Sequence, residues 1–559
     1  MSAAADELAA PLDLLLTSAA VGPLSRFVPN AAWARMATGL AARPRTVGHR
    51  MTDLAGELGQ IAIGHSDRTP SRRDRRFADP AWMQNPILRR VVQAYLAAAD
   101  VAGALPADAG LDWRDRQRMT FLVDNVVQAL APSNNPLLNP TAWKALIDTA
   151  GLSSLSGARN LVRDLSSAPR VPSMVEPTAF EIGTTVAATP GAVVFRNEIL
   201  ELIQYTPQTA KVRTVPLLIV PPVINKYYVV DLAPGRSMVE YFVQQGQQVF
   251  TISWRNPDAR HRDWDLDTYG QAILDAMDSV RRITRTDSTQ LFATCSGGIL
   301  ASMVLGQLAD RGELDRVAGF TLAVSVLDQS RAGLASAALD ERMAAAAIAS
   351  SASKGFLDGR ALAEVFAWLR PTDLIWSYWV NNYLQGRPPA AFDVLFWNAD
   401  TTRMTAGLHR GFVELAMTNA LTEPGAATML GTPVDLAKVG TPAYVVAGIA
   451  DHICPWQSCY RSTQLLGGES RFVLSTAGHI ASMVNPPGNP KATYQVNDSN
   501  PADPEEWLRT ATTEQGSWWP DYIGWLGSRS GRMKAAPKTL GGGGLAPLED
   551  APGSYVRES

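Results

Sequence analysis

The chain has 559 residues, of which 46% are hydrophobic and 18% are charged, and its formal net charge is −3. This length allows two or more domains, or one large α/β domain with insertions, and the small net charge excludes a general attraction to nucleic acid. Three cysteines are too few for a disulfide framework, and the sequence shows neither a basic signal-peptide start nor an apolar run of about 20 residues, so we expect a cytoplasmic protein with no transmembrane segment.

The first 187 residues are expected to be mostly helical. Residues 1–75 are rich in Ala and Leu and are predicted to form a variable segment that is mobile or binds a surface. Residues 76–187 form a helical N-terminal region, in which apolar spacing and clusters of Pro and Asn predict helices at residues 87–99, 113–130, 140–151 and 155–165. No catalytic cluster is apparent here, so the function of this region stays open.

From residue 188 the pattern changes to short apolar strands that alternate with helices. Two runs resemble a hairpin, and a third is the continuous apolar stretch typical of a buried parallel strand, at residues 191–195, 198–205 and 215–220. Helices are then expected at 237–245 and 264–282, and strands at 249–254 and 320–327. The alternation predicts an α/β fold with a mostly parallel sheet, whose first part occupies residues 188–328.

Residues 329–435 interrupt this alternation. An Ala-rich helix over 332–353 is followed by three aromatic stretches within 366–397. We interpret the whole segment as a cap or lid insertion that excludes water from a site. The sheet resumes within residues 436–532, where strands are expected at 442–447 and 471–475, and the Gly- and Pro-rich tail over 533–559 is expected to be flexible.

A nucleophile elbow is the strongest local motif. Residues 290–300 predict a strand, a turn of small residues and a helix, with Cys295 on the turn. The pattern around Cys295 is A-x-C-x-G, whereas the elbow of α/β-hydrolases is G-x-S-x-G. Small neighbours are needed because the nucleophile has a strained backbone and the helix passes close to the strand. A buried structural cysteine is the alternative interpretation.

Two further residues complete a catalytic order. Asp451 and His479 each follow an apolar run, so the chain offers nucleophile, acid and histidine in the order used by α/β-hydrolases. The imidazole would take the thiol proton, and the carboxylate would orient the imidazole. Asp328 is a rival acid. Cys454 and Cys459 are expected to be packed thiols, and because no metal-ligand spacing accompanies them we expect no metal.

Several stretches together resemble the polyhydroxyalkanoate synthases. The resemblance covers roughly residues 75–530 and is carried mainly by Pro221-Pro222-Val223-Ile224-Asn225-Lys226-Tyr227-Tyr228, Ser253-Trp254-Arg255-Asn256-Pro257, Thr294-Cys295-Ser296-Gly297-Gly298, Asp451-His452-Ile453 and Trp379-Val380-Asn381-Asn382-Tyr383. The length and the Cys-Ser-Gly-Gly box are most similar to the single-subunit class II type. Ala293 departs from the family pattern, which usually has Gly at this position.

The resemblance implies an α/β-hydrolase core and a synthase that polymerises (R)-3-hydroxyacyl-CoA, without a cofactor, through an acyl group on Cys295. It implies His479 as the general base and Asp451 as the carboxylate that helps to activate the 3-hydroxyl group. Backbone N–H groups of Ser296 and of Val223 or Ile224 are oxyanion candidates, and His452 and Trp397 are possible supporting residues.

The same resemblance implies a homodimer and association with polyester granules in the cytoplasm, and its class II character suggests substrates of medium length. Two other functions stay open. One is a Cys-dependent thioesterase or esterase of the same fold, and the other is a non-catalytic granule-associated protein.

Overall fold

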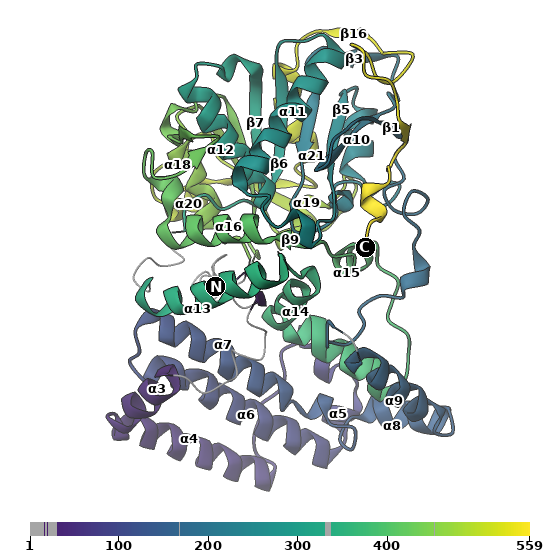
Figure 1. Cartoon of the computed structure of the whole chain (residues 1–559). Coiled ribbons are helices and arrows are strands. Elements are labelled where there is room, and N and C mark those ends of the chain that lie inside the picture. The colour runs from purple at the N-terminus through teal and green to yellow at the C-terminus, as the bar shows by residue number, and fades with distance from the viewer. Residues whose placement is uncertain (1–15, 17–18, 21–30, 167, 330–336, 452) are drawn as a thin grey trace. The chain divides into compact units, whose positions relative to one another are not determined.

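The computed structural model describes residues 16, 19–20, 31–166, 168–329, 337–451 and 453–559 (Figure 1). The chain divides into two compact units. Unit 1 comprises residues 1–21, 177–359 and 392–559, and unit 2 comprises residues 22–176 and 360–391. Within the described ranges, no helix combines the length and the apolar character that crossing a membrane requires.

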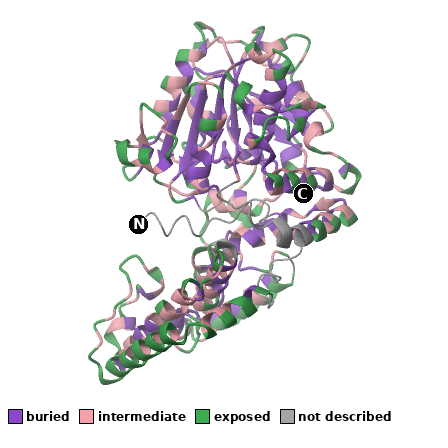
Figure 2. Ribbon diagram, turned by 90° about the vertical axis from the view of Figure 1, so that its left-hand side faces the viewer, coloured by how far each residue is buried: buried purple, intermediate pink, exposed green. Residues whose placement is uncertain are grey.

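An 11-stranded sheet forms the centre of unit 1, in the order β15-β14-β13-β12-β7-β6-β4-β5-β2-β1-β17. Its strands are β1 (Gly191–Arg196), β2 (Leu200–Tyr205), β4 (Leu217–Val220), β5 (Val249–Trp254), β6 (Thr289–Thr294), β7 (Val317–Ala323), β12 (Ala443–Gly448), β13 (Ser470–Ser475), β14 (Thr493–Val496), β15 (Thr512–Gln515) and β17 (Glu549–Asp550). The six central strands, in the sheet order β13-β12-β7-β6-β4-β5, run parallel to one another. The strands at both edges of the sheet pair antiparallel with their neighbours. Figure 2 shows that the central strands of this sheet are largely buried.

The sheet has the layout that the apolar runs predict. Strands β4, β5 and β6 are buried at every position, as expected for parallel strands covered on both faces. Strands β14 and β15 were not predicted, because β15 consists of exposed polar residues that show no apolar alternation.

Helices surround the sheet of unit 1. They are α10 (Met238–Gln244), α11 (Leu266–Thr284), α12 (Ser296–Asp310), α13 (Ala337–Lys354), α15 (Asp393–Ala399), α16 (Ala406–Thr418), α17 (Trp456–Tyr460), α18 (Ser462–Leu465), α19 (His479–Met483), α20 (Pro504–Thr510) and α21 (Trp519–Arg529). Helix α11 begins with a capping box, in which the Asp265 side chain accepts a hydrogen bond from the Thr268 backbone N–H and the Thr268 hydroxyl accepts one from the Asp265 backbone N–H. Three two-stranded sheets join β3 (Lys211–Arg213) to β16 (Met533–Ala535), β8 (Phe356–Leu357) to β9 (Met404–Thr405) and β10 (Thr428–Met429) to β11 (Thr432–Pro433).

Unit 2 is helical. Its helices are α3 (Ala31–Ala41), α4 (Pro44–Ile63), α5 (Ala81–Gln84), α6 (Pro86–Asp108), α7 (Trp113–Ala129), α8 (Pro140–Asp148), α9 (Leu152–Leu165), most of α14 (Gly359–Leu369) and two π-helical turns, Thr372–Trp376 and Trp379–Leu384. Asn-Pro pairs begin α6 and α8, where the Asn side chain caps the first backbone N–H groups and Pro occupies the first helical position.

The expected insertion over 329–435 is divided between the units. Residues 360–391 cluster with the N-terminal helices, where the Asn382 side chain donates to the Ser173 carbonyl and Tyr383 donates to buried Asp164. The remaining described parts of the insertion belong to unit 1. Aromatic composition alone did not reveal these partners, and the lid role stays a prediction.

The tail differs from the flexible segment that the sequence predicts. Strand β16 pairs with β3, β17 pairs with β1, and Tyr555 and Val556 are buried. Buried Glu201 accepts hydrogen bonds from the backbone N–H groups of Ser554 and Tyr555. The tail is ordered because it supplies partners for a sheet edge and for a buried carboxyl group. Of the expected N-terminal segment, residues 31–41 and 44–63 form helices, and most of residues 1–30 lie outside the described part.

Candidate active site

Cys295 occupies the turn between β6 and α12, in a backbone conformation with φ 50° and ψ −124°. Positive φ is unfavourable for a residue with a side chain and persists only where neighbours enforce it. The Cys295 N–H donates to the Ala323 carbonyl at 3.0 Å, and its own carbonyl accepts from Gly298 N–H at 2.9 Å and from Ser325 Oγ at 3.0 Å. These bonds hold the turn, so the motif is a nucleophile elbow in geometry as well as in sequence.

The glycines after Cys295 allow the helix to pass close to the strand. A Cβ atom on Gly297 would lie 2.4 Å from the Pro221 carbonyl oxygen, and one on Gly298 would lie 2.1 Å from Ser325 Oγ. Ala293 is fully buried in β6, so the elbow accepts a methyl group at the position where Gly was expected.

Asp451 and His479 meet in a loop region at the carboxyl ends of β12 and β13. His479 Nδ1 lies 2.7 Å from Asp451 Oδ2, and both side chains are buried. The other carboxylate oxygen, Oδ1, accepts backbone N–H bonds from Ile453 at 2.8 Å and Cys454 at 2.9 Å. Because a carboxylate only accepts, Nδ1 carries the proton in this bond, which leaves Nε2 available for the thiol.

The thiol of Cys295 lies beside this pair. The Sγ atoms of Cys295 and Cys454 and a ring nitrogen of His479 all lie within 4.8 Å of one another. Cys295 is partly exposed, whereas Cys454 is buried. The structure therefore brings together the three residues that the sequence predicts as a catalytic triad, and it adds Cys454.

Charge and burial set the proton positions. Burial lowers the pKa of His479, but the charge and hydrogen bond of Asp451, together with Cys295, outweigh it and raise that pKa to about 10. The hydrogen bond with Cys454, and then burial, raise the pKa of the Cys295 thiol well above its usual value, and His479 opposes both. The thiol therefore holds its proton at neutral pH. The base that removes this proton is the form of His479 in which Nε2 has lost its own proton, and this form becomes more abundant as pH rises.

The rival acid has other partners. Asp328 is buried, pairs with the Arg461 guanidinium and accepts from Asn419 Nδ2 at 3.0 Å. The partner of His479 is Asp451.

The oxyanion candidates are not equivalent. The Val223 N–H donates to Ser296 Oγ at 3.1 Å, so it is engaged within the protein. The Ser296 N–H belongs to the first turn of α12, where backbone N–H groups lack helical partners and point outward. Ser296 is therefore the stronger candidate, and Ile224 stays the second.

Trp397 and His452 were predicted as possible supporting residues. Trp397 is buried on α15, and its Nε1–H donates to the Lys226 carbonyl at 2.7 Å, so it anchors the loop that carries Val223 and Ile224. His452 lies outside the described residues.

Sequence reasoning missed the proximity of Cys454 to the triad. The two cysteines are far apart in the chain, and spacing gives no sign of their contact. The available signal was the Asp451 turn, because a carboxylate that caps the next backbone N–H groups brings residue 454 back toward the carboxylate.

Two family models match the chain. A family model described as the N-terminus of poly-beta-hydroxybutyrate polymerase matches residues 73–242, and one described as the alpha/beta hydrolase fold matches residues 226–486. Together with the sheet, the second match assigns the α/β-hydrolase fold to unit 1.

Curated relatives are similar over most of their length. Poly(3-hydroxyalkanoate) polymerase 2 of Ectopseudomonas oleovorans is 46% identical over 92% of this chain and 91% of its own. Polymerase 1 of the same organism is 45% identical over 90% and 89%, and the polymerase subunit PhaC of Cupriavidus necator is 40% identical over 91% and 87%.

Proposed function

The chain belongs to the poly(3-hydroxyalkanoate) polymerase family, and we propose that it polymerises (R)-3-hydroxyacyl-CoA through an acyl group carried on Cys295. It is an acyltransferase of this class. The observation that carries the proposed role of Cys295 is its position on a strained elbow beside His479, whose other ring nitrogen is held by Asp451.

The first step forms the acyl enzyme. His479 Nε2 takes the thiol proton, the sulfur of Cys295 attacks the substrate carbonyl, and the imidazolium returns a proton to the departing CoA sulfur. One thioester replaces another, so the step costs little free energy. The Ser296 N–H donates to the oxyanion that develops during the attack.

The second step extends the polymer. A 3-hydroxyl group loses its proton to His479 and its oxygen attacks the acyl–Cys295 carbonyl, which forms an oxoester and restores the thiol. Both carboxylate oxygens of Asp451 already have partners, Oδ2 with His479 and Oδ1 with two backbone N–H groups. We therefore assign Asp451 to orienting His479, in place of the help in activating the 3-hydroxyl group that the family resemblance implies.

No step of this scheme requires a cofactor, and we propose that the CoA thioester alone supplies the activated acyl group. The competing function is hydrolysis by the same acyl enzyme, in which water takes the place of the hydroxyl group.

A CoA-release assay with product analysis tests the proposal. The chain is incubated with 3-hydroxyacyl-CoA of short and medium length, and polymer and free 3-hydroxy acid are quantified. The proposal predicts polymer with one CoA per unit for wild type, no CoA release for Cys295→Ala, and retained activity for Cys459→Ala, which removes a different buried thiol. Free acid as the main product would establish the thioesterase, and CoA release by Cys295→Ala would remove Cys295 from the mechanism.

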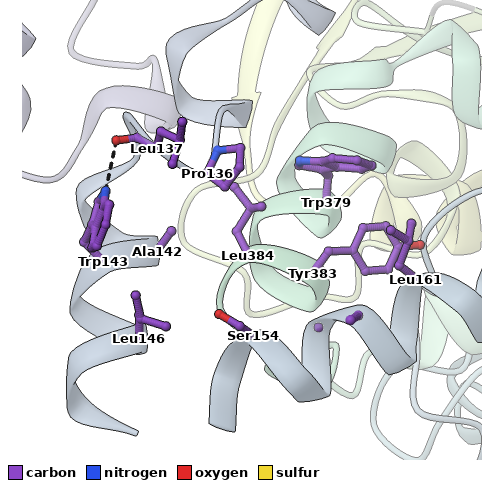
Figure 3. Close-up of a pocket in the computed structure, with 12 residues that line it drawn as sticks. Pro136, Leu137, Ala142, Trp143, Leu146, Ser154, Leu161, Trp379, Tyr383 and Leu384 are labelled. Carbon is purple, nitrogen blue, oxygen red and sulfur yellow. Dashed lines mark hydrogen bonds between the residues drawn. The ribbon is translucent and has the colours of Figure 1, made fainter. Parts of the chain in front are cut away.

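Unit 2 supports the proposed granule association. Helices α8 and α9 expose a set of large apolar side chains, each 45% to 73% exposed: Trp143, Ile147, Leu152, Leu155 and Val162. The same helices line an apolar pocket of about 380 Å³ together with Trp379 and Leu384 (Figure 3). Exposed apolar groups gathered on neighbouring helices are typical of a surface that binds something apolar. We propose that this apolar face, defined by these five side chains, rests on the polyester product.

Co-sedimentation with isolated polyester granules tests the apolar face. The double variant Ile147→Asp with Leu155→Asp is expected to stay in the supernatant. The control Ile87→Asp changes an apolar residue that is 70% exposed on α6, and it should sediment with the granules as wild type does. Unchanged sedimentation of the double variant would contradict the assignment. Analytical ultracentrifugation of the same variants tests the proposed homodimer, because a shift to monomer would make this face a dimer contact instead.

A further inference from the structure

Two thiols and an imidazole converge in unit 1 without any spacing motif. The Sγ atoms of Cys295 and Cys454 and a ring nitrogen of His479 lie within 4.8 Å of one another, in a largely buried setting. In a tetrahedral zinc site, Zn–S distances of about 2.3 Å and Zn–N distances of about 2.0 Å place the ligand atoms slightly under 4 Å apart. The three groups could surround one ion after small side-chain movements.

The donor set selects a soft metal. Two sulfurs and one imidazole nitrogen, with a fourth position left to solvent or substrate, are the ligands of several catalytic zinc sites, whereas Mg²⁺ and Ca²⁺ prefer oxygen. A histidine that binds zinc through one ring nitrogen usually donates a hydrogen bond from the other ring nitrogen, often to a carboxylate, and this bond fixes the ring. The bond from His479 Nδ1 to Asp451 Oδ2 at 2.7 Å already supplies that outer partner.

We propose that Cys295, Cys454 and His479 form an inhibitory Zn²⁺ site, in which the metal occupies the nucleophile and the base together. Binding of the ion stands on the geometry alone. The inhibition rests on the proposed role of Cys295 in polymerisation. Zinc here is an inhibitor that competes with acyl transfer, and it takes no part in the reaction.

Proton balance gives the site a pH dependence. Coordination converts both thiols to thiolates and requires Nε2 without its proton, so up to three protons leave when the ion enters. Zinc affinity therefore increases as pH rises. The charged groups at the cluster include His479 itself and its partner Asp451, whose carboxylate favours a cation.

Direct metal binding tests the site independently of polymerisation. Full-length chain is titrated with Co²⁺, and the thiolate-to-cobalt charge-transfer absorption is recorded, followed by displacement with Zn²⁺. Wild type is expected to bind one ion per chain with this absorption. Cys454→Ala, and Cys454→Ser as a second variant that keeps the side-chain size, should bind at least about 100-fold more weakly, and Asp451→Asn about 10- to 100-fold more weakly.

Cys459→Ala is the matched control, because Cys459 is a buried thiol in contact with the Cys454 carbonyl and lies outside the ligand set. It should bind Co²⁺ as wild type does. Zn²⁺ should also slow alkylation of Cys295 and inhibit CoA release, and a chelator should restore both rates. The activity of each variant is compared with that of the same variant without metal. Unchanged Co²⁺ absorption in both Cys454 variants, or no thiolate absorption in folded wild type, would overturn the proposal.

Discussion

The imidazole of His479 and the carboxylate of Asp451 form a buried hydrogen bond of 2.7 Å between Nδ1 and Oδ2. This bond fixes which nitrogen of the ring is free to act as the base. Asp451→Asn keeps an oxygen for the backbone N–H groups of Ile453 and Cys454. Its amide NH₂ group, which is a donor, then faces Nδ1 in place of the carboxylate oxygen that accepts from it. We expect CoA release to fall by on the order of 10³- to 10⁴-fold, as when the carboxylate of other triads becomes an amide.

The same variant is expected to change the pH dependence of Cys295 alkylation by iodoacetamide. In wild type the pKa of His479 is raised to about 10, so alkylation should increase as pH rises from neutral toward that value. Removing the negative charge of Asp451 destabilises the imidazolium form, so the inflection should move to lower pH. Asp328→Asn, which changes the rival acid, should keep the wild-type profile, and an unmoved inflection in Asp451→Asn would contradict the assigned pair.

The elbow makes a prediction about packing. Gly297→Ala places a methyl group 2.4 Å from the Pro221 carbonyl oxygen, and the neighbouring contact is also backbone, so the strand cannot give way cheaply. We expect a loss of about 2 kcal/mol in the free energy of unfolding. Gly56→Ala is the control because its methyl group meets nothing within 4 Å in α4, and it should be neutral or stabilising by up to about 1 kcal/mol. Equal urea midpoints for the two variants would show that the elbow is not tightly packed.

The ordered tail predicts the effect of truncation. Removing residues 549–559 takes away three hydrogen bonds to the buried carboxylate of Glu201, from Ser554 N–H, Ser554 Oγ and Tyr555 N–H. Arg196 then remains as the main partner of this carboxylate. We expect a loss of about 3 kcal/mol, visible as a lower Tm. Glu201→Gln in the truncated chain should recover part of this loss, because a neutral amide is less costly to bury. A truncated chain with the Tm of the full chain would favour a flexible tail.

Acid sensitivity is expected to involve His409. This side chain is fully buried on α16 with Nδ1 2.8 Å from Ser351 Oγ, and burial lowers its pKa from 6.5 to about 4. A depressed histidine pKa means that the folded state holds the neutral form. The contribution is therefore present above pH 6.5 and is lost as pH falls toward about 4, by on the order of 3 kcal/mol. His409→Gln should show a smaller drop in urea midpoint over this range than wild type, and an equal drop would exclude His409.

Much of the core was predictable because its determinants are local. Strand β5 begins and ends where the apolar run does, and the order of Cys295, Asp451 and His479 follows from strands whose carboxyl ends meet at one edge. Cys454 was not predictable as a neighbour of Cys295, because its position depends on how the Asp451 turn folds back. The tail was misjudged because glycines and prolines indicate flexibility only where no sheet edge or buried carboxyl group offers partners.

Trapping the acyl enzyme tests the central claim most directly. The chain is mixed with a 3-hydroxyacyl-CoA, quenched in acid within the first turnovers, digested and analysed by mass spectrometry. We expect a 3-hydroxyacyl adduct on the peptide that contains Cys295. The adduct should be sensitive to hydroxylamine, absent in Cys295→Ala and slower to form in His479→Gln. An adduct confined to another residue, or polymer formed at the wild-type rate by Cys295→Ala, would contradict it.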